Sequence, residues 1–291
     1  MKKNVFIIDT ATARMNFVFA KLSAIGANCK KYDSNLILPK ISPDNQQLIY
    51  VFSPTYKVNQ DVLNTLPYDA IVFCGKLFFD HASTQPTQKI VSYFQDTEFV
   101  KINSKITAEG ALQLSIANTS LSLFDSNILI LGYGNLAKQL AIEFAPHAKK
   151  LAIATYSKKE LQEAITQYTT YFCTAFLQSL ATFDIVVNTI PAVVINEKAT
   201  FKPDSFLLDL ASTSCLQDNY IPQGVTCLQA LGLPDKTSPQ SAGNYIANFV
   251  MDSLKTFEKQ ATQIVCVNNN CDITEQLPDE ISQDEITFLL T

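Results

Sequence analysis

The sequence predicts an α/β protein in which two domains each contain a parallel sheet covered by helices on both faces. The chain has 291 residues, which suits two domains of ordinary size better than one. Hydrophobic residues make up 47% of it and charged residues 17%, which supplies enough apolar material for two cores. Short apolar runs alternate with segments of helical spacing in two successive series, and this alternation is typical of parallel sheets.

The first series occupies residues 1–106, which we interpret as one domain. Strands are expected at its short apolar runs, which are 5–10, 47–53, 70–74 and 98–103. Helices are expected where apolar residues recur with helical spacing, at 13–25, 62–66 and 88–95. This order of segments places a helix between successive parallel strands.

A long helix over 107–123 is expected to lead into the second series, with Thr107 as its N-cap. The second domain is expected over 124–237. Its strands should be 127–131, 151–156, 184–188, 206–210 and 226–228, with a helix at 135–144. A terminal helix over 238–260 should begin at Pro239, and residues 261–291 should form a flexible acidic tail. Two such halves joined by a long helix are the outline of a two-domain dehydrogenase.

Charge and composition exclude several classes of protein. The net charge of −5 comes from the last twenty residues, without which 21 acidic residues face 22 basic ones. A nearly neutral body without a basic stripe predicts no nucleic-acid partner. No apolar run approaches the ~20 residues of a membrane span, and the apolar stretch after Lys3 is too short for an export signal. An odd number of cysteines, seven, favours a reducing compartment, so we expect a cytoplasmic protein.

Glycine and arginine are scarce, with eight glycines and one arginine, Arg14, in the whole chain. Two of these glycines follow the apolar run 127–131 in the segment Gly132-Tyr133-Gly134-Asn135-Leu136-Ala137, which leads into a helical pattern. In such a turn the first glycine allows the tight bend and the second lets a pyrophosphate approach the backbone at the helix N-terminus. We therefore predict that this loop binds a dinucleotide. A glycine turn without a nucleotide is the alternative.

The end of the next strand indicates which dinucleotide is bound. It carries Tyr156, Ser157 and Lys158, with no acidic residue before Glu160. An acidic residue at this place usually holds the ribose hydroxyls of NAD, whereas a hydroxyl and an ammonium group suit the 2′-phosphate of NADP. We predict NADP as the cofactor. The alternative is that Lys158 is only a solvated residue at the start of a helix.

Two further strand ends should lie at the same edge of this sheet. Thr189, Ile190 and Pro191 follow one strand, and Asp209 and Ser212 follow the next. An open parallel sheet binds its ligand at this edge, so these residues are candidates for contact with nicotinamide or substrate. Alternatively, the proline only terminates its strand and the polar pair caps the following loop.

From about residue 96 onward, the chain resembles the A subunit of dipicolinate synthase, the NADP-dependent spore enzyme. The segments that carry the resemblance are 103–110 (NSKITAEG), the glycine loop, 188–192 (NTIPA), 209–212 (DLAS) and 232–243 (GLPDKTSPQSAG). The resemblance implies a Rossmann domain beside a flavodoxin-like substrate domain. It also implies oxidation of a dihydrodipicolinate-type compound to pyridine-2,6-dicarboxylate, with a flavoprotein-like B subunit as partner. A homo-oligomer is also expected.

A substrate with two carboxylates requires cations or other donors in its site. Arg14, Lys105 and Lys236 are the cationic candidates, and Asn103 is a neutral one. We expect them to bind substrate. The candidate catalytic residues are Ser104 and Glu109 on the link between the domains, together with Ser212. Glu109 is alternatively an ordinary acid in the first turn of its helix.

Histidines and cysteines offer little chemistry. His147 is expected at a helix C-terminus and His81 in a surface loop, so neither is a strong candidate for a base. The cysteines, including Cys173, Cys266 and Cys271, lack the histidine neighbours of a metal site, and we predict no metal. Two other functions stay open: a dehydrogenase of another small keto or imino acid, or an NADP-binding accessory protein without its own chemistry.

Overall fold

The computed structural model describes residues 3–33, 46–78, 88–172, 177, 179–218 and 220–268, with only the backbone described for Leu77, Phe78, Phe172 and residues 261–268. His81, Cys173, Cys271 and all acidic residues of the expected tail lie outside the described residues, as does the side chain of Cys266. Residues 1–249 form one compact unit, and a second unit begins at Val250.

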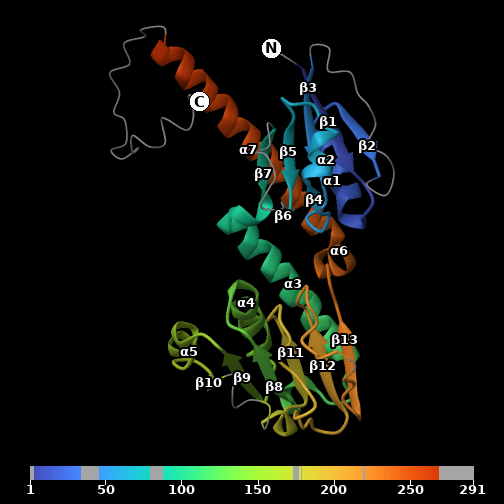
Figure 1. Ribbon diagram of the computed structural model, residues 1–291, viewed down its shortest axis with the longest axis vertical. Coiled ribbons are helices and arrows are strands. Elements are labelled where there is room, and N and C mark those ends of the chain that lie inside the picture. Colours follow the sequence, from blue (N-terminus) through green and yellow to red (C-terminus); the bar gives the residue numbers. More distant parts are fainter. Residues whose placement is uncertain are drawn as a thin grey trace. The chain divides into compact units, whose positions relative to one another are not determined.

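The first sheet has five parallel strands in the order β2-β1-β3-β5-β7 (Figure 1). The strands are β1 (Lys3–Asp9), β2 (Cys29–Tyr32), β3 (Gln46–Val51), β5 (Ile71–Cys74) and β7 (Lys89–Ser92). In order of appearance along the chain this is 2-1-3-4-5, the flavodoxin-like order. Its central strands are apolar because helices such as α1 (Ala13–Ala24) cover them, and Ile7, paired with Tyr50, is fully buried. The flavodoxin-like fold is therefore confirmed.

The second sheet has six parallel strands in the order β10-β9-β8-β11-β12-β13 (Figure 1). The strands are β8 (Asn127–Leu131), β9 (Lys150–Thr155), β10 (Thr169–Phe172), β11 (Ile185–Asn188), β12 (Ser205–Asp209) and β13 (Val225–Gln229). This is the 3-2-1-4-5-6 order of a Rossmann domain. The helix α4 (Asn135–Phe144) follows β8 directly, and both have the predicted bounds. The predicted fold class is confirmed.

Several smaller elements were not predicted. The strands β2 and β10 are edge strands of only four residues, in which polar residues conceal the apolar pattern. Other elements that were not predicted include the short helix α6 (Leu233–Thr237) and the strands β4 (Val58–Asn59) and β6 (Leu77–Phe78), which pair over two residues. For the helix α5 (Lys158–Ala164), the sequence indicated the start but not the end. The short helix predicted at 62–66 is present as α2 (Gln60–Asn64).

The segment between the two sheets differs from the prediction. The expected helix at 88–95 is the strand β7 followed by a 3₁₀ turn, and the expected strand at 98–103 belongs to the helix α3 (Thr97–Ala117). The helix begins ten residues before Thr107 because Asp96 is its N-cap, accepting a hydrogen bond from the Phe99 N–H at 2.6 Å. Thr107 instead donates its hydroxyl to the Asn103 carbonyl within the helix at 2.7 Å. Glu109 is consequently a mid-helix residue, which rules out the first-turn position considered above.

The last helix is also longer than predicted. α7 runs over Pro239–Asn268, so the expected tail boundary at residue 260 is wrong by eight residues. Residues 261–268 contain neither glycine nor proline, and nothing in their sequence ends the helix. In the described part of the chain, no helix combines the length and apolar character needed to cross a membrane.

Candidate functional site

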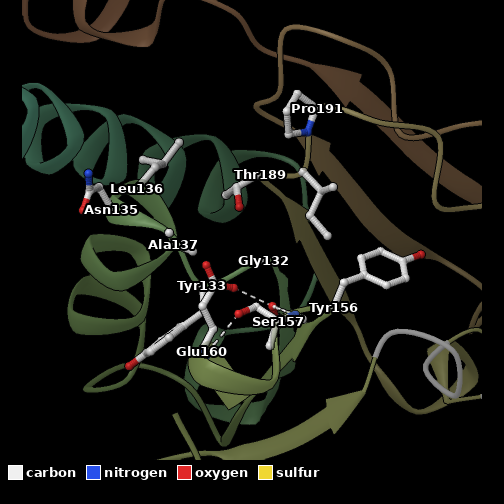
Figure 2. A pocket seen from close by; sticks show the side chains of 13 residues that line it. Gly132, Tyr133, Asn135, Leu136, Ala137, Tyr156, Ser157, Glu160, Thr189 and Pro191 are labelled. Atoms are coloured by element: carbon white, nitrogen blue, oxygen red, sulfur yellow. Dashed lines mark hydrogen bonds between the residues drawn. The ribbon is translucent and has the colours of Figure 1, made fainter. Parts of the chain in front are cut away.

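A cavity of about 390 Å³ lies at the carboxyl edge of the Rossmann sheet (Figure 2). It is bordered by the ends of β8, β9 and β11, where the chain order of the strands reverses and an open α/β sheet binds its ligand. Its lining residues come from the glycine loop, the end of β9 and the turn after β11. They are Gly132, Tyr133, Gly134, Asn135, Leu136, Ala137, Thr155, Tyr156, Ser157, Glu160, Thr189, Ile190 and Pro191.

The two glycines of the loop have different roles. Gly132 has φ +95°, and a Cβ there would lie 2.5 Å from the Thr189 hydroxyl oxygen, so this position requires glycine. Gly134 is the N-cap of α4 in extended conformation, and a Cβ there would meet no protein atom within 4 Å. It also provides no side-chain cap, which leaves the N–H groups of the first turn available to an anion. This open cradle fits a pyrophosphate.

Tyr133, between the two glycines, anchors the loop in the core. Its ring is 6% exposed, lies edge-on to Tyr168 at a centroid distance of 6.3 Å, and has the Lys138 ammonium 5.5 Å from its centroid. Lys138 is in turn 2.6 Å from a carboxylate oxygen of Glu163. Burial raises the pKa of the Tyr133 hydroxyl. The ring therefore stabilises the loop from the core, while Tyr133 also contributes to the lining of the cavity.

The end of β9 is held by a short chain of hydrogen bonds, drawn in Figure 2. The buried Thr155 hydroxyl donates to Glu160 at 2.5 Å and accepts the Ser157 N–H at 3.1 Å. Ser157 caps α5 by accepting the Glu160 N–H at 3.3 Å. Glu160 thus places a carboxylate in the cavity wall. Sequence reasoning missed it, although a serine followed three residues later by glutamate is the signature of a capping box.

A second network fixes the turn after β11. The fully buried Asn188 side chain donates to the Ile190 carbonyl at 3.0 Å and to Asp209 at 2.8 Å, and its oxygen accepts the Ile190 N–H at 3.0 Å. Asp209 also accepts the N–H groups of Ala211 and Cys215, at 3.1 and 2.8 Å. Asp209 therefore holds two neighbouring loops and does not line the cavity. Its direct contact with the cofactor stays a prediction.

The other predicted site residues lie in different surroundings. Lys158 is the exposed first residue of α5 and is not among the lining residues. Of the catalytic candidates, Ser104 is buried on α3, whereas Glu109 and Ser212 are exposed, and none of the three lines the cavity. Arg14 and Asn103, which are 89 residues apart, meet at a second, smaller cavity. Lys105 and Lys236 are exposed and line neither cavity.

The strand order, the positive φ of the first loop glycine and the cavity at the reversal of strand order define the class of this protein. It has the two-domain fold of dinucleotide-binding dehydrogenases, with a Rossmann half and a flavodoxin-like half. Within the class, comparison with known proteins gives a more particular likeness.

No family model matches the chain. The A subunit of dipicolinate synthase from Bacillus subtilis strain 168 is 28% identical to it over 235 residues, which cover 78% of this chain and 79% of the relative. The crystal structure of the same subunit from Bacillus halodurans has a TM-score of 0.67 at 19% identity, covering 87% of this chain and 97% of that one. The crystal structure of the B. subtilis protein has a TM-score of 0.67 at 21% identity, covering 89% and 98%. The predicted resemblance to the A subunit of dipicolinate synthase is confirmed in sequence and in fold.

Proposed function

We propose that this protein is an NADP-dependent oxidoreductase that oxidises a dihydrodipicolinate-type substrate to pyridine-2,6-dicarboxylate. The observation that carries the proposal is the cavity at the glycine loop, where Gly134 leaves an open cradle before the uncapped N-terminus of α4. The sequence likeness to the A subunit of dipicolinate synthase, over 78% of this chain, supports the choice of substrate. A similar activity also implies a partner protein, since the relative is named as one subunit of its synthase.

The choice of NADP is supported by the end of β9. Tyr156 is half exposed there, and Ser157 and Lys158 bring a hydroxyl and an ammonium group to the same turn. The carboxylate of Glu160 already accepts the Thr155 hydroxyl, which directs it toward its own turn. A phosphate near this turn would gain charge-assisted hydrogen bonds from Ser157 and Lys158.

When bound, NADP supplies the acceptor for a hydride from a ring carbon of the substrate, whose ring becomes aromatic as a proton is released. The residues of this chain contribute binding and orientation. The N–H groups at the start of α4 would hold the pyrophosphate, and Tyr133 keeps the loop in place from the core. The turn of Thr189, Ile190 and Pro191, fixed by Asn188, borders the cavity where a nicotinamide ring would lie. Because aromatisation drives the transfer, orientation of the two rings is the main requirement.

A second candidate function is an NADP-binding accessory protein without its own chemistry. It is favoured by the finding that Ser104, Glu109 and Ser212 do not line the cavity. A direct assay separates the two functions. The purified chain is mixed with NADP⁺ and with substrate generated from aspartate semialdehyde and pyruvate, and the formation of NADPH is followed by absorbance. NADPH formation supports the oxidoreductase, whereas an inert protein that still binds NADPH supports the accessory role.

A further inference from the structure

Arg14, the only arginine of the chain, is a buried cation with incomplete pairing. It lies in the first turn of α1 and is 2% exposed. Its Nε atom is buried and has no hydrogen-bond partner among the described residues. Oδ1 of Asp235 is 3.9 Å from this Nε atom, which is beyond hydrogen-bond distance. Burial lowers the pKa of Arg14, and Asp235 and Tyr93 only partly oppose this effect. A buried guanidinium whose Nε atom lacks a hydrogen bond is stabilised by a nearby anion.

The arginine lines a small cavity that no acidic side chain of the described residues lines. The cavity has a volume of about 10 Å³, enough for one water-sized group. Its polar side chains are those of Arg14, Asn103 and Tyr245, and the other lining residues are apolar. Tyr245 is 43% exposed, so the cavity is not sealed from solvent. One oxygen of a carboxylate would fit here, with the Asn103 amide as a second donor.

The N-terminus of α1 already contacts one carboxylate. Its N-cap, Thr12, makes no side-chain cap hydrogen bond. Instead, Oδ1 of Asp235, 221 residues further along the chain, accepts the backbone N–H of Arg14 at 2.8 Å. The helix dipole and the free backbone N–H groups favour an anion at the N-terminus of a helix. Asp235 therefore satisfies the helix end but does not hydrogen-bond to the Nε of Arg14.

The surroundings of Arg14 depend on two close approaches between helices. A Cβ on Gly243 of α7 would lie 2.2 Å from the Arg14 carbonyl oxygen. Any side chain at this position would therefore prevent the close contact between α7 and α1. A Cβ on Gly110 of α3 would lie 2.7 Å from the Thr237 hydroxyl oxygen at the end of α6. Two of only eight glycines thus bring together the four helices that surround Arg14 and Asn103.

We infer that Arg14 and Asn103 bind a carboxylate group of a small-molecule ligand, and that Asp235 is an internal carboxylate that competes with it. The ligand would place one oxygen in the cavity and accept hydrogen bonds from the Arg14 guanidinium and the Asn103 amide. This inference rests on the proposed function, which supplies a substrate with two carboxylates. The competing explanation is that Arg14 and Asp235 form a purely structural pair.

The two explanations differ in the effect of removing each charge. The probe is pyridine-2,6-dicarboxylate, titrated calorimetrically into the full-length protein. Arg14→Gln should weaken its binding by about tenfold or more, the usual effect of one charge-assisted hydrogen bond. Arg14→Lys should weaken it less, because the charge remains but the planar donors are lost. Asp235→Asn keeps an oxygen for the Arg14 N–H and removes the competing charge, so the probe should bind about threefold more tightly.

Lys101→Gln is the matched control, because it removes one positive charge from an exposed position of α3. It should leave probe binding unchanged. Unchanged binding in Arg14→Gln, or weaker binding in Asp235→Asn, would overturn the inference. If Arg14→Gln does not fold, as judged by circular dichroism, Arg14→Lys and Asp235→Asn decide the question by their opposite expected signs.

NADPH titrations of the same samples separate this inference from the proposed function. The Arg14 and Asp235 variants should keep the NADPH affinity of the wild type, because neither residue lines the larger cavity. Failure of the wild type to bind NADPH would contradict the proposed function. If NADPH binds normally and the Arg14 substitutions do not change probe binding, the carboxylate site is contradicted but the proposed function is not.

Discussion

The carboxyl edges of the two sheets are built differently. At the Rossmann sheet the edge is open, because a Cβ added to Gly134 would meet no protein atom within 4 Å. At the flavodoxin-like sheet the loops after β1, β3 and β5 pack closely against one another, and we call this the closed edge. Asp9 accepts the N–H groups of Ala11 and Ser53, and a Cβ on Gly75 would lie 2.1 Å from the Pro54 carbonyl oxygen. Glycine therefore makes space for a ligand at one edge and allows tight backbone packing at the other.

The largest effect is expected at the open edge. Gly134→Val should reduce NADPH binding by about 100-fold or more, because the side chain would occupy the place of the pyrophosphate. Valine is compatible with the local backbone, which has φ −73° and ψ −171°, so the melting temperature should change little. Calorimetric titration and thermal unfolding of the same preparation check both parts. Unchanged NADPH affinity would show that the loop does not bind the cofactor.

The opposite result is expected at the closed edge. Gly75→Ala should lower the free energy of unfolding by about 3 kcal/mol, because its Cβ would overlap backbone atoms of Pro54. Chemical denaturation measures this change, and Gly134→Ala is the control that should leave stability nearly unchanged. Equal free energies of unfolding for Gly75→Ala and Gly134→Ala would contradict the proposed difference in packing between the two edges.

The sequence predicts the open edge better than the closed one because its signals are local. The bounds of β8 and α4 are correct, since an apolar strand, a glycine turn and a helix follow one another within residues 127–144. In contrast, the contact between Arg14 and Asp235 joins residues 221 positions apart, and no spacing in the sequence reveals it. The helix predicted at 88–95 and the strand predicted at 98–103 are wrong because the 3₁₀ turn at Tyr93 has the apolar spacing of a helix. This spacing made Asp96 look like the end of one element, although it is the N-cap of α3.

A smaller effect is expected for the choice of cofactor at the end of β9. Lys158→Ala should weaken NADPH binding by about one to two decades and leave NADH binding nearly unchanged, since only NADPH has a 2′-phosphate. Ser157→Asp should shift the ratio further, because its carboxylate would repel this phosphate. The ratio of the dissociation constants for NADPH and NADH in each variant is the measurement. If neither substitution changes this ratio, the turn does not distinguish the two cofactors.

The smallest effect concerns the hydrogen bonds that hold this turn. Thr155→Val keeps the shape of the side chain but removes the hydroxyl that joins the Ser157 N–H to Glu160. We expect a loss of about 1–2 kcal/mol in the free energy of unfolding, because both partners lose a partly buried hydrogen bond. Thr155→Ser keeps the hydroxyl and serves as the control in the same denaturation experiment. A serine variant less stable than the valine variant would contradict this role of the hydroxyl.

The measurement that tests the central claim most directly is the affinity of the wild-type protein for the two nicotinamide dinucleotides. The cavity at the glycine loop, with Ser157 and Lys158 beside it, leads us to expect that NADPH binds at least about tenfold more tightly than NADH. Parallel calorimetric titrations of one preparation give this ratio. Tighter binding of NADH would contradict the proposed cofactor, and binding of neither would contradict the proposed oxidoreductase.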